Sequence, residues 1–395
     1  MAAADTMSAA EAAAALGVSR ATLYAYVSRG LVASEAGEGP TRARRYPRGP
    51  VEDLIARRER SRDSELAAHG QLHWGLPVLD SELTLIEGGR AYIRGHDLVA
   101  LSRDRMFEEV AALLWTGDPD DAAVLLPPSG DDAAEYLPML GGGPVVEALA
   151  AHLTAAGETS LPTLGAGDAV ALRGAARVVA GLFAAAGAHG PGRLAERLAR
   201  GWGSDRPRDI EAALILSADH ELNVSAFTAR TVASADAGVE HVLLAALCAL
   251  RGRRHGGLTD RVEALVRDAA ADGPARAAER AMTDGGALPG FGHPLYPDGD
   301  PRGAELLRLA TPADPAVAGL VALAEEQLGL RPTLDLGLAA LSRALRLPPG
   351  AALGLFALGR SAGWVAHALE ARRDDRLVRP RSRYTGPPPV GSSTP

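Results

Sequence analysis

Apolar residues recur at helical spacing through most of the stretch from residue 106 to residue 373. A spacing of three to four residues between apolar side chains predicts helices that each turn one face toward a shared core. The 395-residue chain is therefore expected to be all-α and long enough for more than one domain. The predicted helices cover Met106–Trp115, Asp168–Ala186, Asp209–Ala218, Ala226–Ala249, Leu258–Ala271, Pro274–Met282, Gly303–Leu309, Pro315–Leu328, Asp335–Leu345 and Gly350–Arg373.

One β-hairpin is expected before these helices. Leu83–Glu87 and Ala91–Arg94 are predicted to be two short strands, joined by Gly88-Gly89, a pair that suits a tight turn. Glycines and prolines interrupt residues 117–166, so the helical spacing is least regular there.

The first 62 residues predict a small separate unit. Ser8 and Glu11 have the spacing of a capping box at the start of a helix over Ser8–Leu16. Gly17-Val18-Ser19 ends that helix, and Ser19 begins a second one. Two short helices joined by a tight turn make a helix-turn-helix. Pro50 is expected to open a further helix over residues 51–62.

A basic β-wing is expected after the two helices, where arginines follow a Gly/Pro-rich gap. The run SAAEAAAALGVSRATLYAYVSRGLV resembles the DNA-binding head of MerR-type regulators. The resemblance implies that Arg20, Thr22 and Tyr24 face a DNA groove, and that Arg44 and Arg45 of the wing contact phosphates. The alternative is a helix-turn-helix that serves only folding or protein docking.

The charge distribution also divides the chain. Residues 1–62 hold ten arginines against seven acids, a net charge of +3, although the whole chain carries −8. A basic head on an acidic body indicates two parts with different partners. Residues 63–75 are expected to be a linker, and the Gly/Pro/Ser-rich residues 386–395 a disordered tail.

Composition excludes several classes of protein. No apolar run reaches the roughly 18 to 20 residues that a membrane span requires, and the N-terminus lacks a secretion signal, so a cytoplasmic location is expected. All 41 basic residues are arginine, which excludes a Schiff-base lysine. The single cysteine, Cys248, lies in an apolar helical run and is expected to be a buried, inert thiol.

Short polar segments interrupt the helical pattern in the C-terminal half. Each carries residues that core packing alone would not select, and two arginines follow them. They are Asp219-His220-Glu221-Leu222-Asn223, His255-Gly256-Gly257, Gly290-Phe291-Gly292-His293 with Asp300-Pro301-Arg302, Asp335, Arg360 and Arg379.

These residue types suit acid–base chemistry on an anionic substrate. His255 precedes a helix, whose positive end lowers the pKa of an imidazole and keeps the ring neutral, able to stabilise a developing enolate. His293 follows a glycine in a loop, and Asp335 begins an apolar helix as a plausible general base. Arginines match carboxylates bidentately, so three of them would bind a dicarboxylate.

Metal binding is the sharpest alternative for His220, His255 and His293. Their spacings of 35 and 38 residues, without an HxxxH or HxH pair or a cysteine partner, argue against it. No bound metal or cofactor is expected.

The segments DHELNVSAFTAR, HGG, GFGHPLYPDGDPR, the later Asp335, GRSAGWVAHALE and RPRSRYTG resemble the citrate synthase family in order and approximate spacing. RGHDL near residue 94 resembles an early segment of that family, and the resemblance covers about residues 75–386.

The resemblance implies a role for each residue and a mobile, mostly helical fold. Asp335 would take a proton from acetyl-CoA, His255 would hold the enol, and His293 would polarise the oxaloacetate carbonyl. The carboxylates of oxaloacetate would be bound by His220, Arg302, Arg360 and Arg379, the last reaching in from the partner in a homodimer. A coenzyme A thioester is then a co-substrate. A large dimerising domain within residues 76–385 would carry a small mobile subdomain at about residues 256–330.

Departures from the family leave the acyl donor open. Pro294 follows His293, and Pro297 stands where the family commonly has a basic residue that helps hold coenzyme A. Propionyl-CoA, as in methylcitrate synthase, and a citryl-CoA-cleaving direction both remain open. So do a transcription regulator that uses the body as a sensor of CoA or oxo-acid, and a structural protein with a remnant site.

Overall fold

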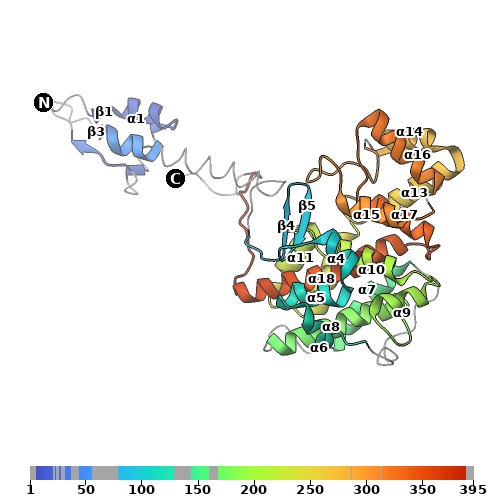
Figure 1. Cartoon of the computed structure of the whole chain (residues 1–395). Coiled ribbons are helices and arrows are strands. Elements are labelled where there is room, and N and C mark those ends of the chain that lie inside the picture. Colours follow the sequence, from blue (N-terminus) through green and yellow to red (C-terminus); the bar gives the residue numbers. More distant parts are fainter. Residues whose placement is uncertain are drawn as a thin grey trace. The chain divides into compact units, whose positions relative to one another are not determined.

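The computed structural model describes residues 6–20, 23, 26–27, 32–36, 44–55, 79–128, 144–159, 168–285, 287–312 and 314–387. It divides into two compact units, Met1–Asp80 and Ser81–Pro395 (Figure 1). The predicted linker 63–75, Thr22, Tyr24 and residues 388–395 of the predicted tail lie outside the described residues.

The first unit contains the predicted capping box. In helix α1 (Ala9–Ala15) the Ser8 hydroxyl accepts a hydrogen bond from the Glu11 backbone N–H at 3.3 Å. The Glu11 carboxylate in turn accepts from the Ser8 backbone N–H at 2.7 Å. This reciprocal pair satisfies two N–H groups that the first turn leaves unpaired, so the first helix begins where the sequence predicts.

The first unit also contains three short antiparallel strands. β3 (Arg44–Pro47) lies between β1 (Thr6–Met7) and β2 (Glu35–Ala36), which makes β2 and β3 the predicted wing. A helix covers residues 48–55, so it begins two residues before Pro50, where the sequence predicts its start. The buried core of the unit is Met7, Ala12, Ala13, Leu16, Leu23, Val32, Tyr46 and Val51.

The second unit begins with the predicted hairpin. β4 (Thr84–Glu87) pairs with β5 (Arg90–Ile93) across the glycine turn, and Gly88 and Gly89 both have positive φ. A third strand, β6 (His96–Asp97), pairs with β5 and was not predicted. The helices are α4 (Leu98–Asp104), α5 (Phe107–Thr116), η1 (Pro119–Asp121), α6 (Ala122–Leu125), α7 (Val145–Thr159), α8 (Asp168–Ala185), α9 (Leu194–Gly201), α10 (Pro207–Ser217), α11 (Val224–Ala233), α12 (Val239–Leu250), α13 (Leu258–Asp272), α14 (Pro274–Gly285), α15 (Pro301–Leu309), α16 (Pro315–Leu323), η3 (Ala324–Leu328), α17 (Leu334–Ala344) and α18 (Ala351–Asp374).

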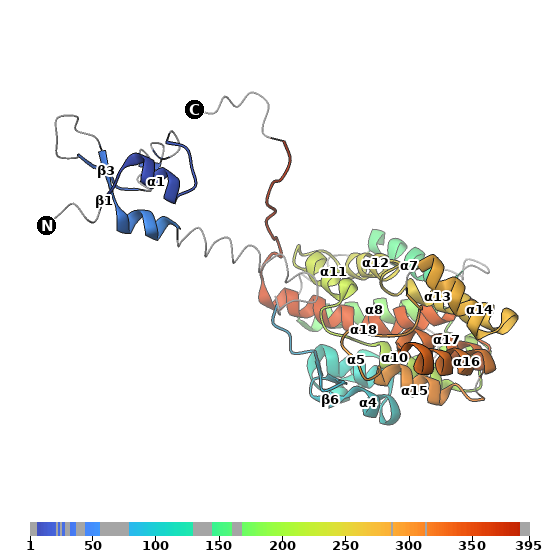
Figure 2. The same ribbon diagram turned by 90° about the horizontal axis from the view of Figure 1, so that it is seen from above.

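Helix α18 forms the centre of this second unit. Every residue from Ala351 to Ala371 is buried, and α18 packs against α5, α7, α8, α10, α11, α12 and α17 (Figure 2). A helix that is buried all around shows little amphipathic pattern, because every face meets another helix. At one end of the unit α13, α14 and α16 pack against one another, and α13 also packs against α17 and α18 (Figure 1).

Two sequence predictions about α11 and α12 were wrong. Residues 226–249 form two helices instead of one, because the chain turns between them at Asp236, which has a φ of 61°. Cys248 is exposed, since its position on α12 lies on the face turned away from the core. Apolar neighbours in the sequence did not reveal which face of the helix it occupies.

No helix among the described residues is long and apolar enough to cross a membrane.

Candidate active site

The N-terminal ends of α15 and α17 meet where two glycines permit close packing. A Cβ atom on Gly303 would lie 2.4 Å from the carbonyl oxygen of Thr333, far inside van der Waals contact. Asp300 fastens the junction: its carboxylate accepts from Arg302 Nε and Nη2 at 2.9 and 2.8 Å and from the Leu334 backbone N–H at 3.0 Å. Arg302 and Asp335 thereby become neighbours.

A second close approach brings Arg360 to the loop after α10. A Cβ atom on Gly363 would lie 2.4 Å from the carbonyl oxygen of Ala218, and the Gly363 N–H donates to that same oxygen at 3.1 Å. Arg360, one turn earlier on α18, donates from Nε to the carbonyl oxygen of Ser217 at 2.7 Å. Gly363, three residues after Arg360, therefore permits the close packing that positions the Arg360 guanidinium.

His220, His293 and Tyr296 form a cluster of rings. The rings of His220 and His293 meet edge to face with their centroids 5.3 Å apart, and His220 Nε2 lies 3.0 Å from the Tyr296 hydroxyl. The Leu295 backbone N–H donates to Nδ1 of His293 at 3.2 Å. Neutral His293 therefore carries its proton on Nε2, where the ring can donate a hydrogen bond.

His255 is held at the start of α13 by a serine. Its Nε2 lies 2.8 Å from Ser225 Oγ, which also receives a hydrogen bond from Trp364 Nε1 at 3.1 Å. The edge of the His255 ring meets Phe356 of α18, with centroids 6.0 Å apart. These contacts from α11 and α18 fix the orientation of the imidazole.

Asp335, the second residue of α17, receives a hydrogen bond on Oδ1 from the hydroxyl of Thr259 at 2.7 Å. Thr259 is fully buried on α13. Asp335 itself stays partly exposed, as do His255 and His293. A carboxylate that is both oriented and accessible is suited to proton abstraction.

Burial lowers the pKa of all three histidines, and nearby guanidinium groups lower it further. The pKa falls to about 3 for His255 and about 4 for His293, and it lies well below 6.5 for His220. The second cause of the lowered pKa, after burial, is the charge of Arg360 for His255 and the charge of Arg302 for His293. The expected lowering at His255 is confirmed, but burial is its main cause instead of the helix dipole. All three rings are neutral at pH 7.

Burial also shifts the pKa values of the acidic and basic groups of the site. Burial raises the pKa of Asp335, and the hydrogen bond from Thr259 and the charge of Arg302 oppose this rise. Burial also lowers the pKa of Arg360 to about 10, which leaves it cationic at neutral pH, and the charge of Asp219 is the strongest influence that opposes this lowering. Asp219 is completely buried and accepts a 2.6 Å hydrogen bond from Thr84.

Six of the seven predicted residues therefore come together. His220, Arg302 and Arg360 are buried, whereas His255, His293 and Asp335 retain access to solvent. Arg379 does not join them: its side chain is exposed in the segment after α18, next to Val378, whose N–H donates to Ser234.

Sequence reasoning assigned no role to four residues that organise the site. Tyr296 lies between His220 and Arg302, whose Cζ is 5.4 Å from its ring centroid, and Asp300 holds the Arg302 fork. Ser225 contacts His255 and Thr259 contacts Asp335. All four lie within or beside the polar segments, but only the fold reveals their partners.

The residues of the first unit that are predicted to contact DNA differ in their exposure and in their hydrogen bonds. Arg20 is exposed. Arg44 donates to the Ser34 hydroxyl at 2.8 Å, whereas Arg45 donates to Thr6 Oγ1 at 3.2 Å and to the Thr6 carbonyl at 3.0 Å. Arg45 thus links β3 to β1 and is only partly exposed.

Among the described residues, no group of three or more His, Cys, Asp or Glu side chains is arranged to hold a metal ion.

Two parts of the chain match families of known proteins. Residues 183–381 match the C-terminal domain of citrate synthase, and residues 6–59 match a helix-turn-helix domain. The first match covers half of the chain and contains all seven predicted residues. The chain belongs to the citrate synthase family, and it carries a helix-turn-helix domain ahead of the family domain.

Individual relatives match over different lengths. "Putative citrate synthase 2" of Mycobacterium tuberculosis is 37% identical over 208 residues, which are 49% of this chain and 56% of that protein. The chain thus spans little more than half the length of these curated relatives. "Citrate synthase" of Haloferax volcanii is 29% identical over 369 residues, covering 79% of this chain and 94% of the relative.

The fold has counterparts among solved structures. The citrate synthase of Thermoplasma acidophilum in ternary complex with carboxymethyl coenzyme A and oxaloacetate matches with a TM-score of 0.63. It is 23% identical, and the match covers 80% of this chain and 95% of that one. At this identity the likeness establishes the fold.

Proposed function

We propose that this protein is an acyltransferase that condenses acetyl-CoA or propionyl-CoA with oxaloacetate, acting in the cytoplasm. The observation that carries the proposal is the combination of a partly exposed, oriented carboxylate with two neutral, accessible histidines and two buried arginines: Asp335, His255, His293, Arg302 and Arg360. A binding protein for oxo-acids would have no need of the base.

The first step is enolisation of the thioester. Asp335 takes a proton from the carbon next to the thioester carbonyl, and its raised pKa makes it a stronger base than an ordinary carboxylate. In this scheme the Ser225 hydroxyl, which donates to Asn223 Oδ1 at 2.8 Å in the structure, turns to donate to Nε2 of His255, so that Nδ1 carries the ring proton. His255 then donates that hydrogen bond to the developing enol oxygen.

The second step forms the carbon–carbon bond. The enol carbon attacks the keto carbon of oxaloacetate, and the carbonyl electron pair moves to oxygen. Nε2–H of His293 donates a hydrogen bond that polarises this carbonyl and holds the resulting alkoxide, since its Nδ1 is occupied by the Leu295 N–H, and the alkoxide takes up the proton that hydrolysis of the thioester by water releases. Arg302, Arg360 and His220 hold the two carboxylates. Water then cleaves the thioester, releasing coenzyme A as the thiol.

The remaining predicted contact to the oxaloacetate carboxylates, that of Arg379, is assigned to the partner subunit. Because Arg379 is exposed on the segment after α18, we propose a homodimer in which it completes the site of the other subunit. We also propose that residues 256–330, which include α13 to α16, form a lobe that closes over both substrates and excludes water until condensation. Pro294 and Pro297 beside His293 leave the choice of acyl donor and the direction of the reaction to experiment.

The test is release of free CoA thiol, with oxaloacetate, from acetyl-CoA and separately from propionyl-CoA. Full-length protein should release thiol only when oxaloacetate is present, and Asp335→Asn should lower kcat by about 10²- to 10⁴-fold. An exposed Arg276→Gln on α14 serves as the matched control and should keep full activity. Protein that is silent with both thioesters would contradict the enzyme and favour the sensor.

The helix-turn-helix match supports a second role, binding of DNA by the first unit. Full-length protein should bind DNA from its own promoter with an affinity that falls steeply with salt. Arg20→Gln should weaken binding and reduce the salt slope by about one, because it removes one phosphate or base contact. Arg45→Gln should instead lower the melting temperature of this unit, since its guanidinium links two strands. Absence of binding at low salt would leave a docking unit.

A further inference from the structure

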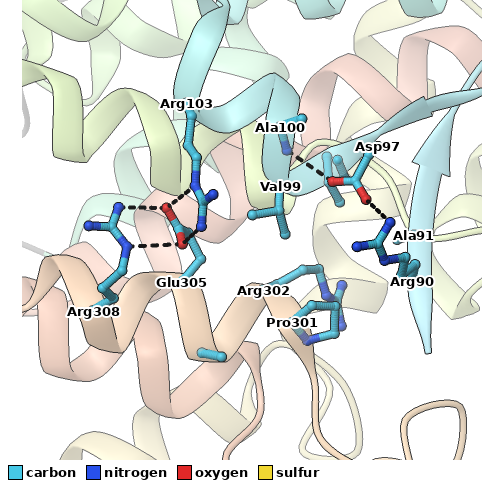
Figure 3. A pocket seen from close by; sticks show the side chains of 12 residues that line it. Arg90, Ala91, Asp97, Val99, Ala100, Arg103, Pro301, Arg302, Glu305 and Arg308 are labelled. Carbon is cyan, nitrogen blue, oxygen red and sulfur yellow. Dashed lines mark hydrogen bonds and ion pairs between the residues drawn. The ribbon is translucent and has the colours of Figure 1, made fainter.

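A pocket of about 620 Å³ lies beside the active site, between the β5–α4 region and α15 (Figure 3). Its volume falls within the range of ordinary small-molecule sites. The pocket is lined by Arg90, Ala91, Asp97, Leu98, Val99, Ala100, Arg103, Pro301, Arg302, Ala304, Glu305 and Arg308. Only Arg302 of these residues belongs to the proposed reaction.

The polar wall of this pocket is organised around one buried carboxylate. Glu305, 4% exposed, accepts from Arg103 at 2.9 and 2.6 Å and from Arg308 at 3.1 and 2.7 Å, as Figure 3 shows. Two guanidinium groups thus share one carboxylate, which leaves a positive charge uncompensated and holds both groups in fixed orientation. Their side chains remain more than half exposed and can be reached from solvent.

The rest of the pocket adds charge and an apolar wall. Arg90 lies across the pocket, 65% exposed, with Asp97 3.6 Å away. Of the four arginines in the lining, Arg302 is paired with Asp300, and the other three face Asp97 and Glu305, so the lining is positive. The other lining side chains are apolar or small: Ala91, Leu98, Val99, Ala100, Pro301 and Ala304.

We propose that this pocket binds a phosphate-bearing organic anion. Guanidinium groups match phosphate oxygens in planar, bidentate geometry, and two of them are already fixed in place by Glu305. The apolar wall formed by α4 and the start of α15 accommodates the organic part. A simple inorganic anion would use the arginines and leave this wall empty.

Helix α15 connects the pocket to the active site. It carries Arg302 in its first turn and Glu305 and Arg308 one and two turns later. Arg103, by contrast, comes from α4, so the Arg103–Glu305 pair fastens α15 to α4. An anion that binds the Nη1 atoms of Arg103 and Arg308, which Glu305 does not contact, joins α4 to α15 and alters how α15 is held. Where the proposed function is correct, the anion and oxaloacetate therefore change each other's affinity by the same factor.

The experiment is calorimetric titration of full-length protein with ADP and, separately, with pyrophosphate, at low and at high salt. Both should bind at one site per chain, ADP more tightly, and both should weaken as salt rises. The double variant Arg90→Gln/Arg308→Gln should weaken ADP at least ten-fold. Arg276→Gln, an exposed arginine on α14, is the matched control and should bind like the unaltered protein.

The outcomes are distinct. ADP binding that changes less than two-fold in the double variant, or no binding of either probe at millimolar concentration, would overturn the site. Tight binding of pyrophosphate with no binding of ADP would contradict the proposal that the ligand has an organic part. Arg308→Gln leaves Arg103 on Glu305, and the single Arg90→Gln variant at an exposed position serves where the double variant folds poorly. Binding is read without turnover, so failure of the proposed enzyme activity does not affect the result.

Discussion

The hydroxyl of Thr259 lies 2.7 Å from Oδ1 of Asp335 and donates a hydrogen bond to it, although 76 residues separate the two in the chain. Asp335 accepts this bond on α17, whereas Thr259 is buried in the first turn of α13. The relationship matters because it opposes the rise in the pKa of Asp335 that burial causes. The group proposed as the base is thus adjusted from a neighbouring helix.

Replacement of Thr259 should move the pH profile of the reaction. Without the Thr259 hydroxyl, the protonated form of Asp335 is favoured and its pKa rises further. As the pH falls, Asp335 is therefore protonated, and lost as a base, at a higher pH than in the unaltered protein. We expect the acidic limb of kcat against pH to shift upward in Thr259→Val, with kcat at pH 7 reduced by about ten-fold. Thr259→Ser, which retains the hydroxyl, should keep the original limb. An unshifted profile in Thr259→Val would show that the bond does not tune the base.

Tyr296→Phe should affect oxaloacetate binding more than turnover. Burial raises the pKa of Tyr296 to about 12, so its hydroxyl stays protonated and forms a hydrogen bond with Nε2 of neutral His220 at 3.0 Å. Loss of one hydrogen bond to a buried imidazole costs about 1 to 1.5 kcal/mol, which corresponds to roughly ten-fold in KM. Steady-state kinetics should give that rise in the KM for oxaloacetate, with kcat nearly unchanged. A fall in kcat alone would place Tyr296 in the chemical step.

Much of this arrangement follows from the sequence, because local patterns determine it. The hairpin around Gly88-Gly89 and the capping box at Ser8 depend on neighbours within a few residues, and both occur as predicted. Six candidate site residues could be singled out in the sequence because their polar segments interrupt apolar helices. Thr259 and Tyr296 act on partners 76 residues away, and no local pattern encodes such a contact. Burial, the main cause of the lowered histidine pKa values, also exists only in the packed protein.

Glu305→Gln should destabilise the protein in a pH-dependent way. Hydrogen bonds from Arg103, and then from Arg308, outweigh burial and lower the pKa of Glu305 from 4.5 to about 2. The carboxylate therefore contributes stability that is complete above pH 4.5 and is lost as the pH falls toward 2. At pH 7 the variant should lose about 2 kcal/mol in the free energy of unfolding. Denaturant titrations should find that this difference narrows between pH 4.5 and 2; a constant difference would contradict the ionised pair.

Two inactive variants should restore activity when they are combined in one dimer. In the proposed homodimer, each site takes Asp335 from its own subunit and Arg379 from the other. Asp335→Asn and Arg379→Gln homodimers should each keep no more than about 1% of activity, since each lacks a reacting or binding group at both sites. A hybrid dimer holds one complete site, built from the Asp335 of the Arg379→Gln subunit and the Arg379 of the Asp335→Asn subunit.

The hybrid is isolated by co-expressing the two variants with different affinity tags and purifying over both. One intact site of two predicts roughly half of the unaltered activity per dimer. Arg376→Gln, an exposed arginine three residues before Arg379, should leave activity unchanged in homodimers and serves as the control. A hybrid as inactive as its parents means that Arg379 serves its own subunit. Failure to recover any doubly tagged protein means that the subunits do not pair at all.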